Sequence, residues 1–124
     1  MSHPNPILII EDDPDIRTTL EMLLSNEGYR VITANHGAEA LDLIRSQNIL
    51  PSLIFLDLMM PIMDGRTFLR EVLADPLIPR IPIFVLTAAT ETVHERIQGT
   101  MRKPFDIEEI LEVAQKFART ASQD

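Results

Sequence analysis

The chain has 124 residues, enough for one domain with its own hydrophobic core. Its 19 acidic and 11 basic residues give a net charge of -8, which opposes binding to the phosphates of nucleic acids. Cysteine is absent, so disulfides, thiolate metal sites and cysteine nucleophiles are all excluded. We expect one cytoplasmic domain over residues 1–124, because no apolar run could span a membrane and no export signal begins the chain.

After an irregular leader over residues 1–6, the apolar run 7–10 predicts a strand that is buried on both faces. Three acids follow it: Glu11, Asp12 and Asp13. An acid followed by Pro14 is typical of a helix start, and apolar residues then recur at helical spacing until Gly28. We predict a second strand over residues 29–34.

The sequence Asn35-His36-Gly37 predicts a turn, and the apolar face of a helix follows it. The next apolar run, 53–56, is short and predicts a buried strand that ends in Asp57. Asp64 and Gly65 then begin another helix.

Residues 83–86 predict a fourth buried strand, directly followed by Thr87. A weak helical pattern covers residues 90–98, and residues 100–102 form at best a very short strand. Asp106 begins the last helix with a capping-box-like pattern completed by Glu109.

Strands and helices therefore alternate five times along the chain. Such alternation predicts an α/β fold in which a parallel sheet carries helices on both faces and the crossovers are right-handed. Open parallel sheets place their ligand sites beyond the carboxyl ends of the strands. We therefore expect the polar residues that follow the strands to meet in one crevice: Glu11, Asp12, Asp57, Thr87 and Lys103.

Three carboxylates in one crevice cannot all ionise without a cation. Oxygen ligands suit a hard ion, and Mg²⁺ typically binds one or two carboxylates and keeps several waters. With such an ion bound, Asp57 could act as a nucleophile toward phosphorus and form an aspartyl phosphate. Lys103 would neutralise the transferred phosphoryl oxygens, and Thr87 could donate a hydrogen bond to one of them.

Four motifs carry a resemblance to a known family, and together they extend over nearly the whole chain. They are Ile7-Leu8-Ile9-Ile10-Glu11-Asp12-Asp13-Pro14, Leu56-Asp57-Leu58-Met59-Met60-Pro61 with Asp64-Gly65, Leu86-Thr87-Ala88, and Lys103-Pro104-Phe105. In this order they resemble the receiver domain of the response regulators of two-component signalling. The resemblance implies a single receiver domain over residues 1–124, with a flavodoxin-like, doubly wound, five-stranded parallel sheet in the order 2-1-3-4-5 and five helices.

The resemblance also implies a function and a role for each matching residue. Asp57 would accept a phosphoryl group from a sensor histidine kinase or phosphotransfer protein, and a downstream protein partner would read the changed surface. Mg²⁺ would bind Asp12 and Asp57 directly, Glu11 mainly through water, and the main-chain carbonyl of Met59. The switch and phosphate-binding positions would be Thr87, Ala88 and Lys103, and the bond before Pro104 would be cis.

The sequence departs from the family pattern between Thr87 and Lys103, where the segment is shorter than in most members. We therefore expect a fourth helix that is short or irregular. Thr100 occupies a switch position that is usually aromatic. Met59 and Ala89 could not position a hydrolytic water well, so we expect no enzyme activity beyond slow self-dephosphorylation.

Two other functional classes compete with a phosphorylated receiver. The chain could be a receiver-like scaffold that binds proteins without phosphorylation, as the shortened segment before Lys103 suggests. A phosphatase with an aspartyl intermediate, similar to the haloacid dehalogenases, would need a second acid two residues after Asp57, where Met59 stands. We expect direct binding neither to nucleic acids nor to membranes.

Overall fold

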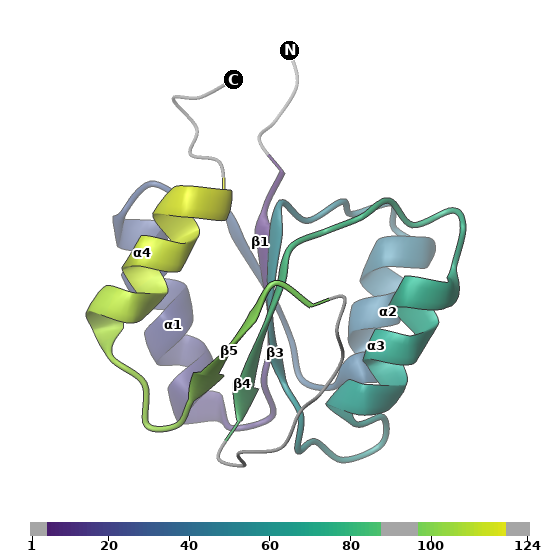
Figure 1. The fold of residues 1–124 in the computed structure, drawn as a ribbon, viewed down its shortest axis with the longest axis horizontal. Helices are drawn as coiled ribbons and strands as arrows, with labels where there is room; N and C mark the ends of the chain where they lie inside the picture. Colours follow the sequence, from purple (N-terminus) through teal and green to yellow (C-terminus); the bar gives the residue numbers. More distant parts are fainter. Residues whose placement is uncertain (1–4, 88–96, 119–124) are drawn as a thin grey trace.

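A computed structural model of the protein describes residues 5–87 and 97–118. Its centre is a five-stranded parallel sheet in the order β2-β1-β3-β4-β5, which confirms the expected flavodoxin-like fold (Figure 1). The strands are β1 (Ile7–Ile10), β2 (Val31–Ala34), β3 (Leu53–Asp57), β4 (Ile83–Thr87) and β5 (Gly99–Arg102). The second strand begins at Val31, two residues later than predicted.

Four helices occur within the described residues and form one layer on each face of the sheet (Figure 1). They are α1 (Pro14–Asn26), α2 (Gly37–Arg45), α3 (Gly65–Ala74) and α4 (Ile107–Phe117). Helices α1 and α4 cover one face, and α2 and α3 cover the other. The short helix predicted over residues 90–98 falls almost entirely on residues 88–96, which lie outside the described part of the chain. None of the described helices is both long and apolar enough to cross a membrane.

The sheet divides the apolar interior into two cores, because successive side chains of a strand point to opposite faces. In β1, Leu8 and Ile10 pack with α2 and α3, whereas Ile7 and Ile9 pack with α1 and α4. All four side chains are fully buried. Burial on both faces explains why the predicted strands are continuously apolar rather than alternating.

Three of the helices begin with a side chain that accepts hydrogen bonds from free main-chain N–H groups. Asp13 accepts from two N–H groups of α1, and Asp64 accepts from one of α3. At α2 the ring of His36 accepts from Glu39, a cap that the sequence had suggested only as a turn. Asp106 stands at the N-cap of α4 but makes no side-chain cap bond, so the predicted capping box is wrong.

The loop between β3 and α3 follows the buried strand and is held close to it. Gly65 lies against the end of β3, where an added Cβ would be 2.5 Å from the Asp57 carbonyl oxygen. Ile62 in the same loop has a φ of 66°, a left-handed conformation that β-branched residues avoid. Its side chain is 81% exposed, so burial does not offset this backbone strain.

Replacing Ile62 by glycine should therefore stabilise the protein by about 0.5–1 kcal/mol, because glycine adopts this φ without strain. The free energy of unfolding can be measured by urea denaturation. Leu77 is a matched control, because it is 90% exposed in a loop and does not have a positive φ. Leu77→Gly should lower the stability, and an Ile62→Gly variant that loses as much stability would contradict the strain.

Candidate functional site

The carboxyl ends of the strands place the predicted polar residues on one rim of the sheet. Glu11 directly follows β1, and Asp57 and Thr87 are the last residues of β3 and β4. Lys103 directly follows β5, and its main-chain N–H donates to the Thr87 carbonyl at 2.8 Å. Because all five strands are parallel, these residues approach one another although they are far apart in the chain.

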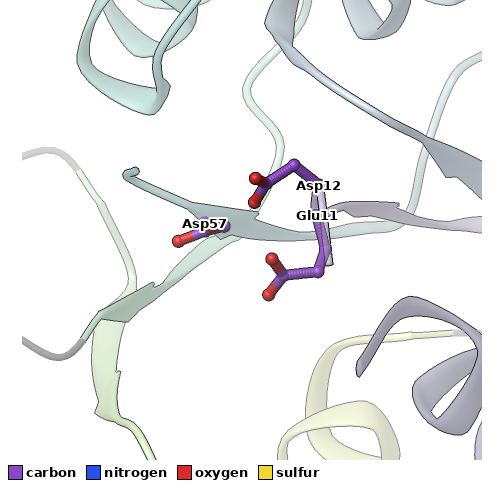
Figure 2. Close-up of side chains that lie close together, drawn as sticks. All are labelled: Glu11, Asp12 and Asp57. Atoms are coloured by element: carbon purple, nitrogen blue, oxygen red, sulfur yellow. The ribbon is translucent and has the colours of Figure 1, made fainter. Parts of the chain in front are cut away.

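Three carboxylates form the centre of this rim. One oxygen from each of Glu11, Asp12 and Asp57 lies within 4.8 Å of the other two. Figure 2 shows the carboxyl groups of Glu11 and Asp12 turned toward the strand that carries Asp57. Glu11 and Asp57 are buried, whereas Asp12 is exposed. The cluster therefore has two buried acids and one that faces solvent.

Lys103 supplies a positive charge to the two buried acids. Its Nζ lies 2.7 Å from Oε1 of Glu11 and 3.5 Å from Oδ1 of Asp57. The Lys103–Pro104 peptide bond is cis, as the family resemblance implied. One lysine cannot neutralise three carboxylates, so the site keeps an excess of negative charge.

Burial and this negative charge together change the pKa of Asp57. Burial, and then the neighbouring Glu11 carboxyl, raise this pKa to about 7 from an ordinary value of 3.8. Lys103 and the Met59 N–H, which donates to Oδ1 at 3.2 Å, act in the opposite direction but are weaker. For Lys103, burial lowers the pKa, but Glu11 and Asp57 outweigh it, so the pKa is raised. An added cation would favour the ionised form of Asp57.

The remaining predicted positions differ in how they relate to the cluster. Met59 lies beside it through the N–H bond to Asp57, and its side chain is 77% exposed. The Thr87 side chain is buried at the end of β4. Thr100 is exposed on β5, in register with Val85 rather than at the rim. Ala88 and Ala89 lie outside the described residues.

One residue of this region was missed by the sequence reasoning. Arg17, in the first turn of α1, donates from Nη1 to the Glu11 carbonyl at 2.9 Å and to the Asp12 carbonyl at 3.4 Å. A basic residue is unexpected there, because the amino end of a helix is the positive end of its dipole. That unusual placement was the available sequence signal.

The donor set fits a hard divalent cation. Carboxylate oxygens from the ends of two adjacent strands lie within 4.8 Å of one another, and one of the three acids is open to solvent for retained waters. The ionised cluster is also short of positive charge. The arrangement can therefore hold a cation between the buried Asp57 and the solvent-exposed Asp12.

Comparison with known proteins gives a consistent result. Residues 7–115 match the family model of the response regulator receiver domain. The response regulator MprA of Mycobacterium sp. (strain KMS) is 38% identical over 128 aligned residues, which include 98% of this chain and 54% of MprA. The chain thus spans about half the length of the curated relatives that it matches.

Solved structures agree with the sequence match. A putative response regulator from Chloroflexus aurantiacus has a TM-score of 0.80 and 31% identity, over 91% of this chain and 96% of that chain. The response regulator TrrA from Thermotoga maritima, solved in complex with Mg²⁺ and BeF, has a TM-score of 0.77 and 28% identity. That alignment covers 90% of this chain and 97% of TrrA.

Because burial raises the pKa of Asp57, its ionisation opposes folding in the absence of a metal. Well below pH 3.8 the Asp57 carboxyl is protonated in both the folded and the unfolded protein, and above about pH 7 it is ionised in both. The full free-energy cost of burying its charge is therefore present only above about pH 7. There, in a chelating buffer, Asp57→Asn should raise the free energy of unfolding by about 1–2 kcal/mol. Urea denaturation should show this gain shrinking toward zero as the pH falls to about 4.

Asp75 provides a control of opposite sign. Its carboxylate accepts hydrogen bonds from the Leu77 N–H and from Arg45, and both lower its pKa. Asp75→Asn should therefore destabilise the protein at any pH above 3.8, the ordinary pKa of an aspartate side chain. A loss of stability in Asp57→Asn at high pH would mean that the buried carboxylate is already compensated without a metal.

Proposed function

The chain belongs to the response regulator receiver domain family, and on this premise we propose that it accepts a phosphoryl group on Asp57 and signals through a changed protein-binding surface. Receiver domains are regulatory parts of two-component systems and interact with histidine kinases or phosphotransfer proteins. The observation that carries the proposal is the position of Asp57, buried at the strand end within reach of Glu11, Asp12 and Lys103.

The transfer that we propose is a substitution at phosphorus. A carboxylate oxygen of Asp57 forms the new bond, and the bond from phosphorus to the donor's imidazole nitrogen breaks and leaves its electron pair on that nitrogen. The Met59 N–H holds Oδ1 from one side, which fixes the direction of the carboxylate. Since the side chain belongs to a strand rather than to a free loop, little reorganisation is needed before reaction.

Mg²⁺ is the cofactor that the site supports best. Asp12 and Asp57 would bind it directly, Glu11 would act through water, and the main-chain carbonyl of Met59 would complete the protein ligands. When bound, the ion would neutralise negative charge on the phosphoryl oxygens during transfer. The carboxylate cluster and the raised pKa of Asp57 support this assignment.

Lys103 and Thr87 would act on the phosphoryl group once it is attached. The Lys103 ammonium group already lies 3.5 Å from Oδ1 of Asp57, which places a positive charge beside the new oxygens. Thr87 ends the neighbouring strand, where Leu86 is in register with Asp57. A hydrogen bond from its hydroxyl would bias the surface near the end of β4 toward an active arrangement.

We extend the proposal to domain organisation and activity. Residues 1–124 would form one receiver domain, and its downstream partner would be a protein. Activity would be limited to slow self-dephosphorylation, because the side chain two residues after Asp57 is the apolar Met59. The scaffold alternative receives no support from a site in which every charged residue of the phosphorylation set is brought together.

Incubation with Mg²⁺ and a small phosphodonor such as acetyl phosphate should add one phosphoryl group, measured by intact-protein mass spectrometry. Asp57→Asn and removal of Mg²⁺ by a chelator should each reduce the adduct to background. Asp13→Asn is the matched control, because it makes the same chemical change nearby and still caps α1. An adduct that persists in Asp57→Asn would refute Asp57 as the acceptor and return the scaffold to consideration.

A further inference from the structure

The loop between β1 and α1 carries the one exposed acid of the cluster. Within residues 5–87 and 97–118, the Asp12 carboxylate forms no hydrogen bond, so its direction depends on the main chain that carries it. By contrast, Glu11 is tied at both ends: its N–H donates to the Ala34 carbonyl and its Oε1 accepts from Lys103. The question is what fixes the main chain around Asp12.

The two peptide groups that flank Asp12 are both held by side chains. The carbonyl before it, that of Glu11, accepts from Nη1 of Arg17 at 2.9 Å. In the peptide group after it, the carbonyl accepts from the same Nη1 at 3.4 Å, and the Asp13 N–H donates to Oε2 of Glu11 at 3.2 Å. Arg17 is therefore the residue that contacts both peptides, and its main chain is held in α1 because its N–H donates to the Asp13 carbonyl.

Because Arg17 is positively charged, its electrostatic effect on metal binding can be distinguished from its effect on geometry. A cation in the first turn of a helix is opposed by the dipole, so its position needs another source of stabilisation. Charge-assisted bonds to two carbonyls supply it. The same charge close to three carboxylates would by itself weaken the binding of a metal cation. Charge and geometry thus predict opposite effects of removing this side chain.

We propose that Arg17 is a positioning residue for the metal site, which holds the Glu11 and Asp12 peptide groups so that the Asp12 carboxylate points at the ion. This inference rests on the proposed Mg²⁺ site and adds to it a residue that contacts neither the ion nor the phosphoryl group. Outer residues that orient metal ligands commonly change metal affinity about 10-fold or more when they are removed. We expect an effect of about that size.

The test is an Mg²⁺ titration followed by two-dimensional ¹⁵N NMR of the amides of residues 11–13, without any phosphodonor. Arg17→Ala should weaken Mg²⁺ binding about 10-fold. Arg17→Lys should recover part of the affinity, because an ammonium group can still donate to one of the two carbonyls. In the metal-free protein, Arg17→Ala should also shift the Asp12 and Asp13 amide signals, since their peptide groups lose a partner.

Arg70→Ala is the matched charge control, because it removes one positive charge from an exposed position on α3. It should leave Mg²⁺ affinity unchanged or slightly increased. If Arg17→Ala binds Mg²⁺ as tightly as the wild type or more tightly, the proposal is overturned. Tighter binding would show that the charge of Arg17 matters and its position does not. If Arg17→Ala does not fold, as judged by thermal unfolding, an unchanged affinity in Arg17→Met, which keeps an unbranched side chain but has no donor, would overturn it instead.

The experiment separates this inference from the proposed function. Wild-type protein that binds no Mg²⁺ at residues 11–13 would refute the metal site itself, and with it both proposals. Wild-type binding that is lost in Asp12→Asn but unaffected in Arg17→Ala would leave the proposed function intact and refute the role of Arg17 alone.

Discussion

The structure depends on one electrostatic constraint, the burial of two carboxylates beside each other at the carboxyl ends of β1 and β3. Glu11 and Asp57 are almost fully enclosed, and a single lysine contacts both. Such a cluster is costly to bury and short of positive charge, as the raised pKa of Asp57 records. A protein selected for stability alone would replace these acids. In the function proposed above, these acids form the site for a cation and a phosphoryl group.

The surrounding loops hold this unfavourable cluster in place through the main chain. Met59 donates its N–H to Asp57, and Arg17 holds the peptide groups next to Asp12. Gly65 allows α3 to begin directly against the end of β3, where any side chain would collide with the Asp57 carbonyl. In the same loop, the main chain of Ile62 adopts a strained left-handed conformation. The site is thus locally unfavourable for folding. The two apolar cores, one on each face of the sheet, provide the stability that offsets it.

Family membership and the local departures concern different parts of the molecule. Glu11, Asp12 and Asp57 lie at the carboxyl ends of β1 and β3, within the residues that match the receiver family model. At the other edge, Thr100 is a small exposed residue on β5. The aromatic side chain that the family resemblance led us to expect at this position is therefore absent. In the function proposed above, a change of surface on phosphorylation would begin from Thr87 and Lys103 instead.

The sequence by itself determined the fold class, the strand-end placement of the acids and the order of the motifs, because buried parallel strands must be continuously apolar and must end in loops. It also placed Asp13 and Asp64 at helix starts, since these caps are local interactions. Only the tertiary structure decided which groups meet. The bond from Lys103 to Glu11 joins residues that are 92 positions apart, and the contacts of Arg17 need a particular path of the loop before α1. Local pattern carries no information on such distances, because they are set by how the strands and helices pack.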